Sequence, residues 1–182
     1  MELKDYRLEI VNALLKGEGH VRGLASKIGV NHMTVLRKIK ILFRENVVDY
    51  NEEGKNKVYF IKKNPEAKYY TFMAEYYKLI QTLKKYPYLR KVIEKIQKDK
   101  NIELAILFGS HAKHEAKKDS DVDIYIETKD KKIKQDLERI DSKLSIKIGA
   151  YDRKNLLIKE IEKNHIIIKG VEEFYEKNEF FG

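Results

Sequence analysis

Leu107-Phe108-Gly109-Ser110-His111-Ala112-Lys113 and, after six intervening residues, Ser120-Asp121-Val122-Asp123-Ile124 are the most informative segments of the chain. The first segment places a Gly-Ser pair directly after an apolar run that predicts a β-strand. The second opens another predicted strand with two aspartates. Because strand side chains alternate, both carboxylates leave the same face, where they form a hard oxygen site that suits Mg²⁺. The alternative is that the two aspartates only cap a strand exposed to solvent.

Together these two segments resemble the minimal nucleotidyltransferases of the DNA polymerase beta superfamily, over roughly residues 90 to 176. The resemblance implies a nucleoside triphosphate as substrate or ligand, with Mg²⁺ neutralising its phosphates. It also implies roles for individual residues. It assigns nucleotide binding to Gly109, Ser110, Lys113 and Ser120. It assigns metal binding and catalysis to Asp121 and Asp123.

The strand that follows lacks an acidic residue. Active members of the family carry a third aspartate there, which helps to bind metal and activates the attacking hydroxyl. In this chain the strand reads Leu144-Ser145-Ile146-Lys147-Ile148-Gly149, and we align Lys147 with the missing aspartate. A lysine at that position would repel a metal ion. We therefore expect Lys147 to pair with Asp121 or Asp123, and turnover to be very slow or absent.

The N-terminal part has the pattern of three helices followed by a hairpin. Apolar residues recur at helical spacing within residues 5–16, 21–28 and 31–46, and two strand-like runs follow at residues 47–51 and 57–62. Gly29 permits a tight turn before the third helix, which Asn31 can cap. This order, and the stretch from Leu24 to Arg37, resemble the winged helix-turn-helix of bacterial and archaeal transcription regulators.

That resemblance implies duplex DNA as a partner, with the third helix in the major groove and the hairpin as a wing. The expected DNA-binding residues are Asn31, His32, Thr34, Arg37, Lys38, Lys55 and Lys57. Regulators of this kind usually act as homodimers, and the Tyr-rich helical stretch after the hairpin could supply a dimer surface. A purely protein-binding or dimerising role for this domain stays open.

The distribution of charge agrees with a polyanionic partner for the first part of the chain. Residues 1–102 hold 22 Lys and Arg against 12 Asp and Glu, whereas residues 103–182 hold 16 against 17. A positive field attracts nucleic acid, although surplus lysine also serves solubility. The charged residues reach 37% and the chain has no Cys, so disulfides and thiolate zinc sites are excluded. The Lys- and Glu-rich composition is typical of proteins from thermophiles.

These observations predict an α+β chain of three parts. The expected parts are a winged helix-turn-helix over residues 1–64, a helical connector over 65–100 and a mixed-sheet nucleotidyltransferase fold over 101–182. Residues 1–6 are charged, and no apolar run approaches the length of a membrane span. We therefore expect a cytoplasmic protein without a signal peptide.

Two functions from different classes follow. The first is a DNA-binding transcriptional regulator whose second domain binds nucleotide or a partner protein and is catalytically doubtful. The second is an active metal-dependent nucleotidyltransferase that transfers a nucleoside monophosphate to protein, RNA or a small molecule. The family resemblance makes this second role compatible with an antitoxin that modifies or masks a toxin-like partner.

Overall fold

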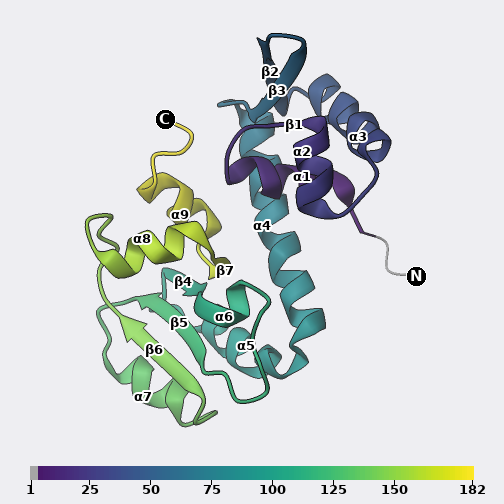
Figure 1. Cartoon of the computed structure of the whole chain (residues 1–182). Coiled ribbons are helices and arrows are strands. Elements are labelled where there is room, and N and C mark those ends of the chain that lie inside the picture. Colours follow the sequence, from purple (N-terminus) through teal and green to yellow (C-terminus); the bar gives the residue numbers. More distant parts are fainter. Residues whose placement is uncertain (1–3) are drawn as a thin grey trace. The chain divides into compact units, whose positions relative to one another are not determined.

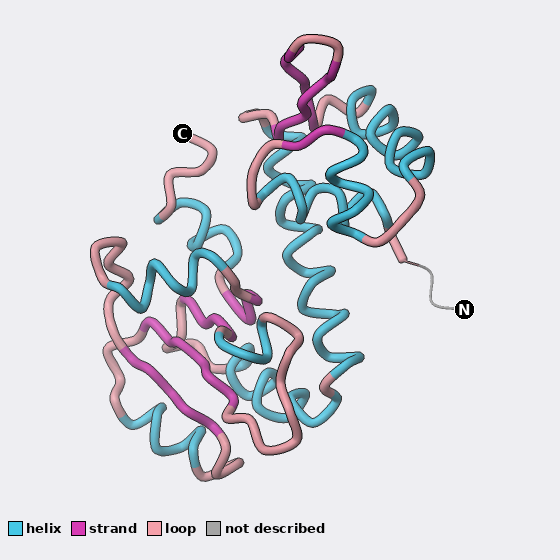
Figure 2. Tube along the Cα trace, in the orientation of Figure 1, coloured by secondary structure: helices cyan, strands magenta, loops and turns pink. Residues whose placement is uncertain are grey.

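The computed structural model describes residues 4–182, so the first half of the charged N-terminal stretch lies outside the described residues (Figures 1 and 2). The chain forms two compact units. Unit 1 comprises residues 1–77 and 180–182, and unit 2 comprises residues 78–179. The chain passes from one unit to the other within helix α4, Pro65–Lys85.

Unit 1 opens with the three expected helices, α1 (Tyr6–Leu15), α2 (Val21–Ile28) and α3 (His32–Arg44). Asp5 caps α1 by accepting a hydrogen bond from the Arg7 amide. Asn31 caps α3 in the same way, with its Oδ1 accepting from the Met33 amide at 2.8 Å. Gly29 ends α2 in the left-handed conformation, with φ of +69°, so the turn between α2 and α3 uses the freedom that only glycine has at low cost.

The sheet of unit 1 has three antiparallel strands in the order β1-β3-β2. Strands β2 (Val48–Glu53) and β3 (Asn56–Ile61) form the predicted hairpin. Strand β1 (Gly19–His20) pairs with Tyr59 and Val58 of β3. The sequence did not predict β1, because two residues are too few to show an alternating pattern. Three helices and a small sheet ending in a hairpin are the arrangement of a winged helix.

The helical stretch after the hairpin is not an independent connector. It contains α4, a short 3₁₀ turn (Pro87–Leu89) and α5 (Arg90–Lys98). Ala67 and Ala74 of α4 are buried in the core of unit 1, whereas Leu79 belongs to the core of unit 2. The boundaries expected at residues 64 and 100 therefore do not coincide with the two units, because the first half of α4 completes the core of unit 1.

Unit 2 is built on a mixed four-stranded sheet in the order β6-β5-β4-β7. Strands β5 (Val122–Glu127) and β6 (Leu144–Ile148) are parallel, while β4 (Leu104–Leu107) is antiparallel to β5 and to β7 (Ile166–Lys169). The helices of this unit besides α5 are α6 (Gly109–Ala112), α7 (Lys132–Glu138), α8 (Leu156–Lys163) and α9 (Val171–Lys177). Together the two units give the predicted α+β class.

One apolar core fills unit 2 between the sheet and the helices. Val122, Ile124 and Ile126 of β5 are buried together with Val92 and Ile96 of α5. Because side chains alternate along β5, Asp123 is directed to the other face of the sheet. Within residues 4–182, no helix is both long enough and apolar enough to cross a bilayer.

Candidate nucleotide site and candidate DNA-binding face

The connection between β4 and α6 lies against the start of β5. The Phe108 amide donates to the Asp123 carbonyl at 3.0 Å. Gly109 follows with φ of +67°, and a Cβ atom at this position would lie 2.6 Å from Oδ2 of Asp123. The absence of a side chain at residue 109 therefore allows the carboxylate to lie directly against the backbone of the Gly-Ser loop.

Two carboxylates mark this site. Asp123 is half-buried on β5, and Asp121 is exposed immediately before the strand begins. Over residues 4–182, no three acidic or histidine side chains are grouped so that they could hold a metal ion. Mg²⁺ commonly takes one or two protein carboxylates and completes its shell with phosphate oxygens and water. The pair of aspartates beside the Gly-Ser loop fits that mode of binding.

The register of the parallel strands corrects the position expected for the third carboxylate. Asp123 lies opposite Ser145, whereas Lys147 lies opposite Tyr125. Lys147 is exposed, and no ion pair within residues 4–182 joins it to Asp121 or Asp123. The expected ion pair was wrong because two residues along a strand correspond to about 7 Å. Ser145, a neutral residue, is the neighbour of Asp123.

The other residues expected to bind nucleotide have contacts of their own. Lys113 forms an ion pair with Glu160 of α8, with 3.3 Å between Nζ and Oε1. The Ser120 hydroxyl accepts from the Lys117 amide at 2.9 Å and so shapes the loop before β5. Ser110 is half-buried in the first turn of α6. Gly109 and Ser110 therefore lie beside Asp123, while Lys113 and Ser120 make contacts that stabilise the surrounding loop.

A family comparison agrees with this geometry. Residues 90–179 match the family model described as "Polymerase beta, Nucleotidyltransferase". These residues form a nucleotidyltransferase domain. The match confirms the resemblance inferred from the Gly-Ser and Asp-Val-Asp segments and covers almost all of unit 2. No curated protein matches the chain.

The sequence favours a solvated or phosphate-facing role for the lone histidine in the Gly-Ser loop, but the structure buries it. The His111 side chain is fully buried, and its Nε2 lies 2.7 Å from the Tyr88 hydroxyl. The Tyr86 ring packs edge-on against the imidazole, with 5.0 Å between ring centroids. Burial lowers the pKa of His111, while the nearby backbone of Asp121 and the charge of Asp123 act in the opposite direction. His111 thus links Tyr88 to the aspartate site, and no spacing pattern connects residues so far apart in the chain.

The candidate DNA-binding face lies on α3 of unit 1. His32 and Arg37 are exposed, whereas Thr34 and Lys38 are half-buried. The oxygen of the Asn31 side chain is used to cap the helix. The inward side chains of the helix, Val35, Ile39 and Leu42, are buried in the core. Of the residues expected to contact DNA, Arg37 therefore lies on the side of α3 away from the core, and His32 is exposed at the start of the helix.

The β2–β3 hairpin of unit 1 carries two exposed lysines. Lys55 is in the turn between β2 and β3 and is exposed, as is Lys57 on β3. The Lys57 ammonium lies 3.8 Å from the centroid of the Tyr50 ring on β2. Its contact with Tyr50 raises the pKa of Lys57, so the residue is a stable cation. Both lysines occupy the positions expected for a wing.

A solved structure similar to part of the chain is a winged helix. It is the solution structure of the homodimeric winged helix-turn-helix DNA-binding domain of a possible ArsR-family transcriptional regulator from Mycobacterium bovis. The similarity covers 43% of this chain and 70% of that chain, with 21% identity and a TM-score of 0.34.

Proposed function

We propose that the protein is a DNA-binding transcriptional regulator whose nucleotidyltransferase domain binds a nucleoside triphosphate together with Mg²⁺. The contact between Gly109 and Asp123 is the observation that carries the nucleotide half of this proposal. It brings a carboxylate against a side-chain-free backbone position, and Ser110 follows that position in the chain. Such a combination suits a metal–phosphate ligand better than it suits a strand cap.

In this proposal Asp121 and Asp123 hold the metal ion, and the backbone around Gly109 and Ser110 approaches the phosphates. The Mg²⁺ would neutralise the phosphate charge and fix the orientation of the triphosphate. Lys113 and Ser120 support the site through their contacts with Glu160 and Lys117. Lys113 would reach a phosphate only by leaving Glu160.

Binding without efficient turnover is supported by the residue next to Asp123. A general base has to accept a proton from the attacking hydroxyl within hydrogen-bonding distance. Ser145 lies in the neighbouring position on β6, and a serine hydroxyl is a poor base and a weak metal ligand. The site therefore keeps two of the three acidic groups that two-metal phosphoryl transfer uses.

The DNA half of the proposal is supported by the winged-helix arrangement of unit 1 and by its charge. Arg37 is exposed on the side of α3 away from the core and His32 is exposed at the start of the helix, where they can reach base edges and phosphates. Lys55 and Lys57 extend the cationic surface along the hairpin. Tyr69, Met73 and Tyr76 are exposed along one stripe of α4, and we propose that this stripe pairs two copies of the chain in a homodimer on DNA.

The family match favours a second candidate, an active nucleotidyltransferase. Its acceptor would be a protein, RNA or a small molecule, and a toxin-like protein is one such partner. Incubation with labelled nucleoside triphosphates and cell extract distinguishes the two candidates. The regulator account predicts no labelled product, whereas labelling that disappears in Asp123→Asn would establish the enzyme.

DNA binding measured with and without nucleotide tests the regulator proposal. Fluorescence anisotropy with genomic duplex fragments at low salt should show binding by the full chain. A mixture of nucleoside triphosphates with Mg²⁺ should change the affinity, and Asp121→Asn combined with Asp123→Asn should remove that change. Failure of the intact protein to bind any duplex would exclude the regulator. A DNA affinity that does not change with nucleotide would mean that the protein binds DNA without coupling it to nucleotide binding.

A further inference from the structure

The end of α4 and the turn after it contact residues 109–115, the Gly-Ser segment. The Lys85 ammonium donates to the His114 carbonyl at 2.6 Å. The Tyr86 ring lies nearly parallel to the His114 imidazole, with 6.2 Å between ring centroids, and edge-on to the His111 imidazole at 5.0 Å. The Tyr88 hydroxyl lies 2.7 Å from Nε2 of His111. Two hydrogen bonds and two ring contacts therefore join the end of this helix to one short segment.

Hydrogen bonds hold the Gly-Ser segment together. The Lys113 amide donates to the Gly109 carbonyl at 3.2 Å, and the Glu115 amide donates to the Ser110 carbonyl at 2.9 Å. A contact made at either histidine of the segment is thus passed to the Gly-Ser pair through one or two backbone hydrogen bonds. This pair is the part of the chain that we propose to approach the phosphates.

The contact between Tyr88 and His111 is the most direct link to the aspartate site. His111 is fully buried, and the backbone of Asp121 and the carboxylate of Asp123 are near enough to influence its imidazole. Tyr88 lies in the 3₁₀ turn that follows α4. One hydrogen bond therefore joins the turn after this helix to a buried group beside the proposed metal ligands.

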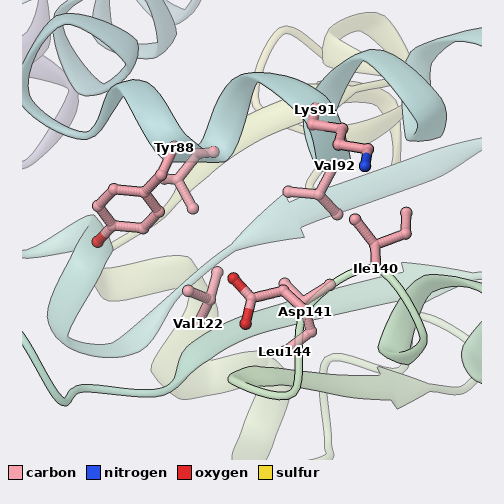
Figure 3. Close-up of a pocket in the computed structure, with 8 residues that line it drawn as sticks. Tyr88, Lys91, Val92, Val122, Ile140, Asp141 and Leu144 are labelled. Atoms are coloured by element: carbon pink, nitrogen blue, oxygen red, sulfur yellow. The ribbon is translucent and has the colours of Figure 1, made fainter.

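Packing alone does not fix the direction of the Tyr88 side chain. The residue is 56% exposed, and its ring lines a cavity of about 140 Å³ together with residues that include Val92, Val122 and Asp141. In Figure 3 the hydroxyl is at the end of the ring away from Val92. Because the ring has solvent or open space on several sides, the hydrogen bond to His111 is the contact that orients it.

We infer, on the basis of the proposed function, that the Tyr88–His111 hydrogen bond couples nucleotide binding to DNA binding. The first half of α4 is buried in the core of unit 1 through Ala67 and Ala74, so this continuous helix joins the winged helix to the turn that carries Tyr88. A nucleotide on the Gly-Ser segment would favour one arrangement of that segment. The coupling equals the difference in free energy of the hydrogen bond between the occupied and the empty arrangement.

The test measures the affinity of the full chain for duplex DNA by fluorescence anisotropy, with and without an equimolar mixture of ATP, GTP, CTP and UTP with Mg²⁺. The parent is compared with Tyr88→Phe, which keeps the ring and removes the hydroxyl bound to His111. Tyr86→Phe is the matched control, because within residues 4–182 the buried Tyr86 hydroxyl has no hydrogen-bond partner. Calorimetry with the same mixture shows whether each variant still binds nucleotide.

The parent should change its DNA affinity about five-fold when nucleotide is added, and Tyr86→Phe should show the same change. Tyr88→Phe should bind both ligands with a DNA affinity that nucleotide hardly alters, since one neutral hydrogen bond accounts for an effect of about five-fold. Coupling is reciprocal, so DNA should change the nucleotide affinity of the parent by the same factor and that of Tyr88→Phe hardly at all.

A response of Tyr88→Phe equal to that of the parent would overturn this route and leave the proposed function standing. Loss of the response in Tyr86→Phe as well would also overturn it, because ring packing rather than the hydrogen bond would carry the effect. Loss of nucleotide binding in Tyr88→Phe would overturn it too, by placing the hydroxyl in the binding site. If the parent binds both ligands without coupling, the inference fails. If the parent fails to bind DNA or nucleotide, the proposed function fails and the inference with it.

Discussion

Oδ2 of Asp123 lies so close to Gly109 that a Cβ atom on residue 109 would come within 2.6 Å of it. Gly109 also has φ of +67°, a conformation that costs a residue with a side chain about 1–2 kcal/mol. The loop and the carboxylate therefore constrain each other. Neither can be altered without moving the other.

Gly109→Ala should consequently destabilise the protein and abolish Mg²⁺-dependent nucleotide binding. Gly54→Ala is the matched control, because Gly54 has φ of +60° and open space where its Cβ would be. Both substitutions carry the backbone strain, but only Gly109→Ala displaces a carboxylate. Thermal unfolding and calorimetry measure the two effects. Equal nucleotide affinity in the two variants would show that the Gly109–Asp123 contact plays no part in binding.

Arg37→Ala together with Lys38→Ala should weaken duplex DNA binding at low salt. If each cation contacts a phosphate, the slope of log affinity against log salt should fall by about one for each lost contact. Lys129→Ala with Lys131→Ala removes the same charge from exposed positions in the nucleotidyltransferase domain. Anisotropy titrations at several salt concentrations compare the two double variants. Identical slopes in the two double variants would mean that DNA affinity depends only on the net charge of the protein. The assignment of the DNA contact to α3 would then be wrong.

Ser145→Asp should strengthen Mg²⁺ binding, because it adds a carboxylate on the residue paired with Asp123. The expected gain is about ten-fold or more in affinity, and labelled nucleotide transfer becomes possible once a base is present. Lys147→Asp adds the same group beside Tyr125 and should have the smaller effect. Ser145→Asn controls for the change of shape. A larger gain from Lys147→Asp than from Ser145→Asp would contradict the observed register.

Tyr77→Phe should make the protein more resistant to alkali. Burial, together with the charge of nearby Glu9, raises the pKa of Tyr77 to about 12, and the hydroxyl donates to Glu9 Oε1 at 3.1 Å. The unfolded chain loses this proton near pH 10, so between pH 10 and 12 the folded state binds more protons and its stability falls as pH rises. Denaturation midpoints from pH 8 to 11.5 should decline less steeply in Tyr77→Phe. Tyr69→Phe, at an exposed position, should retain the parent's slope.

The sequence predicted the parts of the fold that depend on local spacing. Asn31 caps α3, Gly29 terminates α2, and the β2–β3 hairpin lies where its apolar alternation indicated. In the nucleotidyltransferase domain, the mixed sheet contains the two strands predicted beside the Gly-Ser and Asp-Val-Asp segments, in the expected chain order. These features follow from helix capping, turn chemistry and side-chain period, which are encoded within a few residues.

Relations between distant segments could not be predicted in this way. Alternation along β6 fixed which face Ser145 and Lys147 share, but it could not fix which of them lies opposite Asp123, since register depends on how two strands pair. The hydrogen bond between Tyr88 and His111 joins residues 23 positions apart, and it depends on how the segments around Pro87 and Gly109 pack together. The cavity around Asp141 likewise exists only after α5, β5 and β6 have assembled.

The central claim is that Asp121 and Asp123 bind a metal–nucleotide complex. Calorimetry of a Mg²⁺–nucleoside triphosphate with the full chain tests it most directly, comparing the parent with Asp121→Asn combined with Asp123→Asn. Asp119→Asn serves as the control, because this neighbouring carboxylate is almost fully exposed and lies 4.0 Å from the Lys143 ammonium. We predict binding that requires Mg²⁺ in the parent and in Asp119→Asn, and no measurable binding in the double variant. Equal affinity in the parent and the double variant would contradict the account.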